Sequence, residues 1–170
     1  LLGLRATLQR EFDGQFGGFG EAPKFPQPMN LELLLRLWRS SATGDEPDLQ
    51  ALYMATLTLT RMAEGGLFDQ LGGGFCRYSV DQYWMIPHFE KMLYDNGPLL
   101  ALYAETAIAT GDEFYASVAA ETAQWVMREM QPQDRVQAVE HAAQVGEGRR
   151  GSDPREAGPR AGGRTPGPGA

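Results

Sequence analysis

A histidine and two charged side chains stand close together near the middle of the chain. His88, Glu90 and Lys91 lie within four positions of one another. A histidine can exchange protons near neutral pH, and a carboxylate can orient it or share the proton transfer. The same spacing also fits a buried, hydrogen-bonded His88 beside a local ion pair of Glu90 with Lys91. The spacing therefore indicates a candidate acid–base site and leaves a purely structural role open.

Aromatic side chains are frequent around these residues, in the stretch 69–96. Tyr78 and Trp84 lie in its polar part, so we interpret them as candidates for stacking on a sugar ring. Cys76 stands next to Arg77, which could lower the pKa of a thiol, but no His–Asp context accompanies it, and we interpret it as a small packing residue. One histidine and one glutamate fall short of a zinc ligand set, so no metal or cofactor is predicted.

Helices must position these residues, because apolar side chains recur at helical spacing on both sides of the stretch. No segment is typical of a buried strand, although the alternation around 74–80 could form a small hairpin. The fold class is therefore all-α, with about five helices. They are expected over residues 1–12, 29–40, 47–63, 98–110 and 112–126.

The chain also contains a repeat. Gly-Gly-Phe at 17–19 leads to Pro23-Lys24-Phe25, then Asn30, and Gly-Gly-Phe at 73–75 leads to Pro87-His88-Phe89, then Asn96. A helical hairpin cannot cover its own apolar face, so repeated hairpins predict an α/α toroid, of which this chain would be a part. Because both long loops precede the same kind of helix, we expect them on one rim. The residues expected on that rim are Glu21, Lys24, Arg77, Tyr78, Asp81, Trp84, His88, Glu90, Lys91, Tyr94 and Asp95.

Composition limits the classes of partner. The 170 residues carry a net charge of -7, which argues against nucleic acid, since a phosphate backbone needs a basic surface. No apolar run approaches the roughly 18 residues of a membrane span, so no membrane partner is predicted. The single cysteine allows no internal disulfide and fits a reducing compartment, which predicts a cytoplasmic protein. The N-terminal residues resemble a helix entered midway, so we expect a fragment.

The chain divides into two unequal parts, a folded domain over residues 1–130 and a tail over 131–170. The tail contains no Leu, Ile, Phe, Tyr or Trp, and is expected to be disordered because it cannot bury enough apolar surface. One interpretation is a natural flexible extension. The other is an out-of-frame product of GC-rich DNA, because the chain has two lysines beside 13 arginines.

Two stretches carry a family resemblance. FGGFGEAPKFPQP (16–28) and DQLGGGFCRYSVDQYWMIPHFEKMLYDN (69–96) resemble the signatures of the spermatogenesis-associated, thioredoxin-domain-containing proteins, also called YyaL-like, and the match covers about 1–130. The resemblance implies part of an (α/α)6 barrel similar to N-acylglucosamine 2-epimerases and six-hairpin glycosidases. It also implies a thioredoxin-like domain in the intact protein. The family usually has histidine where this chain has Cys76, which removes one polar group.

The resemblance also implies roles for the rim residues. By analogy with the related epimerases, His88 would be the acid–base group, with Glu90 or Asp95 as its orienting partner. Arg77 or Lys91 would bind sugar oxygens, and the expected substrate contacts are Lys24, Arg77, Tyr78, Asp81, Trp84 and Lys91. The function implied is a fragment of a carbohydrate-active barrel, epimerase- or glycosidase-like, with a sugar as its ligand. The alternative is a non-catalytic helical scaffold or interaction module that is inactive as this truncated chain, and whether it is an enzyme stays open.

Overall fold

The computed structural model describes residues 2–130, so the predicted tail at 131–170 lies outside the described residues. The helices are α1 (Leu2–Glu11), α2 (Pro28–Ser41), α3 (Leu49–Glu64), α4 (Leu93–Thr110) and α5 (Glu113–Glu129). Two short strands, β1 (Tyr78–Ser79) and β2 (Pro87–His88), pair antiparallel. The prediction of an all-α chain with about five helices is confirmed, and the small hairpin forms between 78–79 and 87–88 rather than within 74–80.

Local sequence accounts for the starts of α3 and α5. The carboxylate of Asp48 accepts from the backbone N–H of Ala51 and begins α3, and Asp112 likewise begins α5. Helix α4 begins before Pro98 rather than at it, and this differs from the sequence prediction. The reason is that the carbonyl oxygen of Met92 already accepts from the N–H groups of residues 95 and 96.

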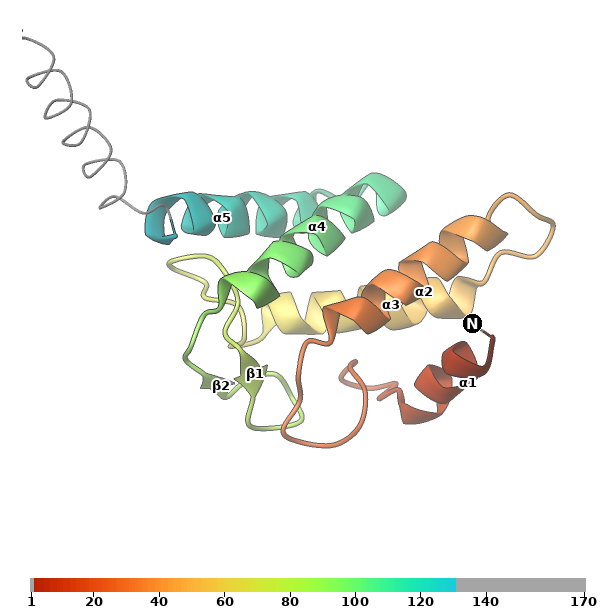
Figure 1. Cartoon of the computed structure of the whole chain (residues 1–170), viewed down its shortest axis with the longest axis horizontal. Coiled ribbons are helices and arrows are strands. Elements are labelled where there is room, and N and C mark those ends of the chain that lie inside the picture. The colour runs from red at the N-terminus through yellow and green to blue at the C-terminus, as the bar shows by residue number, and fades with distance from the viewer. Residues whose placement is uncertain (1, 131–170) are drawn as a thin grey trace, which may run out of the picture. The chain divides into compact units, whose positions relative to one another are not determined.

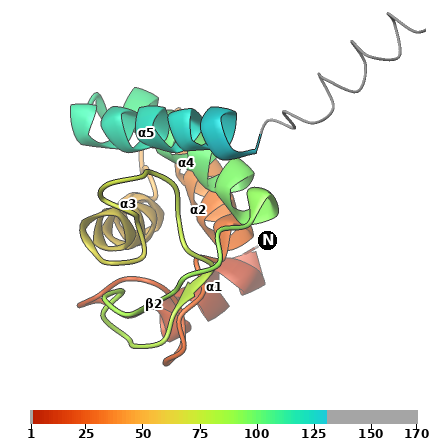
Figure 2. The same cartoon turned by 90° about the vertical axis from the view of Figure 1, so that its left-hand side faces the viewer.

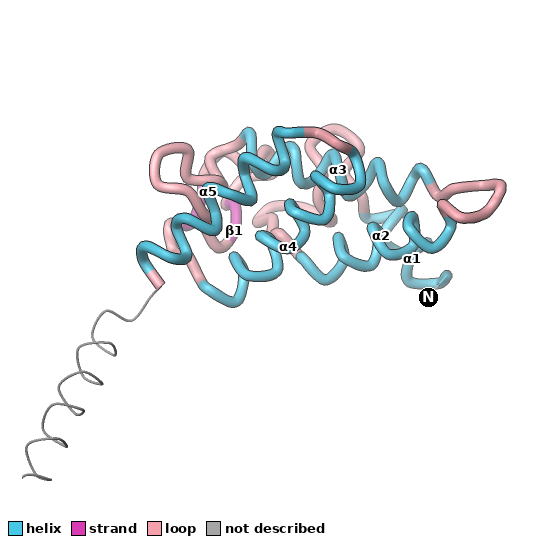
Figure 3. Tube along the Cα trace, turned by 90° about the horizontal axis from the view of Figure 1, so that it is seen from above, coloured by secondary structure: helices cyan, strands magenta, loops and turns pink. Residues whose placement is uncertain are grey.

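The helices form two hairpins that lie side by side. Helix α2 packs along α3, α4 packs along α5, and α2 also contacts α4 (Figure 3). The core between them is apolar, and its largest fully buried side chains include Leu34, Met54, Leu59, Leu99 and Tyr103. None of the helices between residues 2 and 130 is long and apolar enough to cross a membrane.

Two long loops lead into α2 and α4, and we call them the first rim loop (residues 12–27) and the second rim loop (residues 65–92). Figure 1 shows the second rim loop and both strands at the lower left, below the start of α4, and Figure 2 looks onto that end of the molecule. The loops meet directly, since Lys24 and Ser79 form a backbone bridge. The expectation of one shared rim is thereby confirmed for these loops.

Candidate functional site

Three aromatic rings lie in a row where the two rim loops meet. The ring of Tyr78 stacks on Phe25 and on His88, with 4.8 Å between ring centroids in both pairs. The backbone explains the row, because β1 pairs with Lys24 on one side and with β2 on the other. We call Phe25, Tyr78 and His88 the rim row.

A charged pair lies beside the rim row. The Nη1 of Arg77 donates to Oε2 of Glu90 at 3.0 Å, and Nε2 of His88 lies 3.6 Å from the same oxygen. The second distance is too long for a hydrogen bond. Glu90 is therefore hydrogen-bonded to Arg77 and lies near the imidazole of His88 without a hydrogen bond to it. The hydrogen bond to Glu90 raises the pKa of Arg77. All three side chains are about half exposed, which leaves them open to a ligand.

Asp95, in the first turn of α4, has an unsatisfied carboxylate oxygen. Its Oδ2 is buried and has no hydrogen-bond partner among residues 2–130. Burial raises the pKa of Asp95, and the charge of Arg77 opposes that shift. A buried acceptor without a donor costs about 1–3 kcal/mol, so a small movement that exposes Oδ2 to a donor on a bound molecule would be favourable here.

Asp95 also lines a hollow of about 260 Å³ between the two rim loops and α4. Exposed faces of Phe25 and Tyr94 contribute apolar surface, and Arg77 contributes a hydrogen-bond donor. Gln27 has a left-handed backbone, with φ 47°, directly before α2. The full lining is Phe25, Pro26, Gln27, Pro28, Arg77, Tyr94 and Asp95.

The two lysines expected to bind substrate are engaged inside the loops. Each Nζ atom lies 2.6 Å from an aspartate Oδ2 and 2.8 Å from a glycine carbonyl oxygen. Lys24 is 1% exposed, and the side chain of Lys91 is 17% exposed. The structure therefore corrects their role, because both ammonium groups already bind the loop and are not presented to a ligand.

Trp84 and Asp81 are also part of the loop framework. Trp84 is fully buried and its Nε1 donates to the carbonyl of Phe16 at 2.9 Å, so its ring offers no face to a sugar. The carboxylate of Asp81 accepts from three backbone N–H groups within 83–86 and from the hydroxyl of Ser79. The expected contacts of both residues with a substrate are replaced by contacts that shape the second rim loop.

Sequence reasoning missed Phe25 and Gln27 as lining residues. The prolines on both sides of Gln27 favour an extended backbone at that residue, so they did not indicate the left-handed conformation that the structure has there. Cys76 is buried, and burial raises the pKa of its thiol, so its interpretation as a packing residue is confirmed. Within the described part of the chain, no three His, Cys, Asp or Glu side chains form a group that could hold a metal ion.

The carboxylate of Asp69 predicts a pH-dependent stability. The Lys91 ammonium and the N–H of Gly72 lower its pKa from 3.8 to about 2 in the folded chain. A pKa that is lower when folded stabilises the fold above about pH 3.8, and this contribution is lost as the pH falls towards 2. We expect Asp69→Asn to lower the free energy of unfolding at pH 7 and to match the parent chain near pH 2. Urea unfolding of both chains from pH 7 to pH 2 checks this, and a difference that does not shrink with acid would contradict it.

Known proteins resemble this chain at two levels, in sequence and in fold. No family model matches the chain. Spermatogenesis-associated protein 20 of Mus musculus is 47% identical over 121 residues, which are 71% of this chain and 15% of that protein. Its Homo sapiens counterpart is 45% identical over 123 residues, 72% of this chain and 16% of that protein. The chain therefore spans about 15% of the length of these curated relatives.

Among solved structures, cellobiose 2-epimerase from Spirochaeta thermophila DSM 6192 superposes with a TM-score of 0.57 and 23% sequence identity. The match covers 74% of this chain and 32% of that chain. At this identity the likeness concerns the fold alone. It confirms the predicted partial α/α toroid, in which the two hairpins α2–α3 and α4–α5 are neighbouring units.

Proposed function

Because this chain is homologous to a segment of the spermatogenesis-associated protein 20 proteins and has the α/α-toroid fold, we propose that its two rim loops bind a carbohydrate in the intact protein. The observation that carries the proposal is the hollow beside Asp95 and Arg77. It brings the side chains of Asp95 and Arg77 together with the aromatic rings of Phe25 and Tyr94. The epimerase that shares the fold acts on a sugar, as its name states, and that supports the same class of ligand.

The chemistry of the lining fits a neutral polyhydroxylated ring. A hydroxyl group can donate to the carboxylate of Asp95 and accept from the guanidinium of Arg77, so one diol would satisfy both. Phe25 and Tyr94 can contact the apolar face of the ring, as ligand sites combine apolar walls with a few polar groups. Lys91 does not take part in this proposal because its ammonium is bound to Asp69.

We assign proton transfer, if the intact protein is an enzyme, to His88. Its imidazole is about half exposed at the edge of the rim row and is approached by Glu90 rather than by Asp95. Glu90 would therefore be its orienting partner, and Arg77 would bind ligand oxygens. The reaction itself, an epimerase- or glycosidase-like step, is proposed by analogy at the level of the fold.

The test uses calorimetric titration of the longest polypeptide that contains this chain with glucose, mannose, N-acetylglucosamine and cellobiose. At least one saccharide should bind, and Asp95→Asn should weaken it about 10- to 100-fold, because a hydrogen bond to a charged group contributes about 1.5–3 kcal/mol. Asp45→Asn, at an exposed loop position, is the matched control and should bind as the parent does. No binding of any saccharide, or equal affinity for Asp95→Asn, would refute the proposal.

His88→Gln separates binding from chemistry. It should keep the affinity within a few-fold and abolish turnover of the saccharide that binds, because the glutamine amide cannot exchange a proton as imidazole does. Undiminished turnover by His88→Gln would remove His88 from the proposal and leave the binding site in place.

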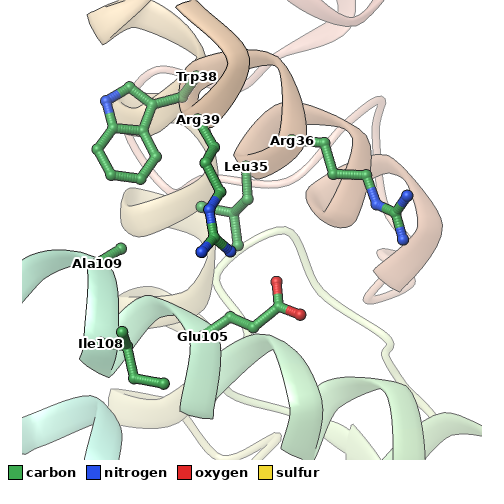
Figure 4. A pocket seen from close by; sticks show the side chains of 7 residues that line it. All are labelled: Leu35, Arg36, Trp38, Arg39, Glu105, Ile108 and Ala109. Carbon is green, nitrogen blue, oxygen red and sulfur yellow. The ribbon is translucent and has the colours of Figure 1, made fainter. Parts of the chain in front are cut away.

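A second hollow supports a second candidate, a non-catalytic interaction module. It measures about 370 Å³ and lies between α2 and α4. Figure 4 shows Arg39 pointing towards α4, while Arg36 points to the side, where it pairs with Glu32 of α2. Its lining is Leu35, Arg36, Trp38, Arg39, Glu105, Ile108 and Ala109. A thioredoxin-like domain in the intact protein is proposed from the resemblance, and this candidate predicts protein binding without turnover of any sugar.

A further inference from the structure

The first rim loop is closed by Lys24. Its Nζ donates to Oδ2 of Asp13 at 2.6 Å and to the carbonyl of Gly17 at 2.8 Å. The ammonium lies 5.7 Å from the centre of the Trp84 ring. That ring also covers Gly18, where an added Cβ would come within 2.6 Å of the indole. We call this set of an aspartate, a Gly-Gly pair, a lysine and a covering tryptophan a clasp.

The second rim loop has the same clasp. The Nζ of Lys91 donates to Oδ2 of Asp69 at 2.6 Å and to the carbonyl of Gly73 at 2.8 Å. The ammonium lies 5.3 Å from the centre of the Trp125 ring, and an added Cβ on Gly74 would come within 2.7 Å of that ring. The two clasps correspond contact for contact. The counterpart of Lys24 is therefore Lys91, and not His88, with which the repeat in the sequence aligns it.

The clasps differ in the length of chain that they close. Aspartate and lysine are 11 residues apart in the first clasp and 22 residues apart in the second. The extra residues of the second rim loop contain both strands and Trp84, which is the covering tryptophan of the first clasp. In each loop the clasp therefore joins an early residue to a late one. The second rim loop also supplies Trp84, the tryptophan that covers the first clasp.

The lysine of each clasp lies at or near one edge of the backbone ladder that carries the rim row. Lys24 and Ser79 exchange two backbone hydrogen bonds of 2.8 Å, so the first clasp holds one edge. Strand β2 forms the other edge, and two residues separate its end from Lys91. Phe25 is next to the first lysine, and Glu90 is next to the second.

We propose that Lys24 and Lys91 are equivalent positioning residues, one for each edge of this ladder. Lys24 sets the distance of Phe25 from Tyr78, and Lys91 sets the position of His88 and Glu90 against Tyr78 and Arg77. This goes beyond the proposed carbohydrate site, because it concerns the geometry of the rim row with or without a ligand.

The test compares Lys24→Met and Lys91→Met in the full chain by NMR, with assigned indole N–H signals and aromatic ring protons. Lys24→Met should shift the Trp84 indole signal and remove the ring-current shift between Phe25 and Tyr78, while the Trp125 signal stays within the spread of the control. Lys91→Met should shift the Trp125 indole signal and reduce the upfield ring-current shift of the His88 ring protons, while the Trp84 signal stays. Arg36→Met, whose side chain is 74% exposed, is the control for losing a cationic side chain.

Two results would overturn the proposal. One is a loss of thermal stability in both variants with the stacking shifts of Phe25 and His88 unchanged, which would leave the lysines a structural role only. The other is that either substitution shifts both indole signals equally. If a methionine variant does not fold, Asp13→Asn and Asp69→Asn decide the same question, because asparagine keeps the Oδ1 acceptor for the turn and removes the charge that the lysine binds.

Discussion

Gly73→Ala is expected to lower the free energy of unfolding by about 2–5 kcal/mol. Gly73 has φ +74°, a left-handed conformation that costs a residue with a Cβ about 1–2 kcal/mol. The added Cβ would also lie 2.5 Å from the carbonyl oxygen of Glu121 in α5, and overpacking of this kind costs about 1–3 kcal/mol. Since the clashing atom belongs to the backbone of a helix, it cannot rotate away. Urea unfolding followed by circular dichroism measures the loss.

Gly20→Ala is the matched control for this prediction. Gly20 has φ +76°, but no atom lies within 4 Å of the position of its added Cβ. Only the backbone penalty of about 1–2 kcal/mol should remain. The difference between the two variants then measures the close approach of the second rim loop to α5. Equal losses in the two variants would contradict that approach.

Asn96→Ala is expected to cost about 2–6 kcal/mol of stability. Asn96 is fully buried, its Oδ1 accepts from the N–H of Phe75 at 2.7 Å, and its Nδ2 donates to the carbonyl of Phe75 at 2.9 Å. Alanine would leave both backbone groups of Phe75 buried without a partner, and each unsatisfied group costs about 1–3 kcal/mol. Phe75 also stacks on Tyr103 of α4, so the Asn96 contact joins the rim loop to the helical core.

Asn30 offers a natural comparison, because it occupies the corresponding place in the sequence repeat. Its side chain donates to Oε1 of Gln27, a neighbour in sequence, and not to the Gly-Gly-Phe loop. Asn30→Ala should therefore change the stability by about 0.5 kcal/mol or less, as is usual away from buried networks. Comparable losses for Asn30→Ala and Asn96→Ala in urea unfolding would show that the buried hydrogen bonds are not the cause.

The helices were predictable because their signals are local. The apolar spacing over 29–40 comes from one helix face, and the structure has α2 at Pro28–Ser41. The start of α4 was misplaced, since Pro98 is a strong local signal for a first helical turn. A contact to the carbonyl of Met92 begins the helix earlier, and nothing in the residue types indicates that contact.

The rim was predictable as a region but not residue by residue. The short strands β1 and β2 pair with each other, and this pairing places Arg77, which precedes β1, close to His88 and Glu90 at the end of β2. Trp84 was expected in the site because its sequence neighbours are polar, yet its left-handed backbone, with φ 65°, turns the ring into the protein. Burial of that kind depends on the first rim loop, which lies more than 60 positions away in the chain.

The sequence contained a signal for one half of each clasp, the aspartate, but none for its lysine partner. Both rim loops contain Phe-Asp, at 12–13 and at 68–69, and each aspartate stands four positions before a Gly-Gly pair. This spacing could have identified the two aspartates as the fixed start of each loop. The lysine partners could not be found by spacing, because the segments between aspartate and lysine differ twofold in length.

Amide mapping by NMR of the chain titrated with the tightest-binding saccharide tests the central claim most directly. We predict that amide chemical-shift changes gather at Phe25, Gln27 and Arg77 and at residues 94–95, around the hollow beside Asp95. Changes that gather instead at Leu35, Trp38 and Ile108, around the hollow between α2 and α4, would contradict the assignment of the ligand site to the rim loops.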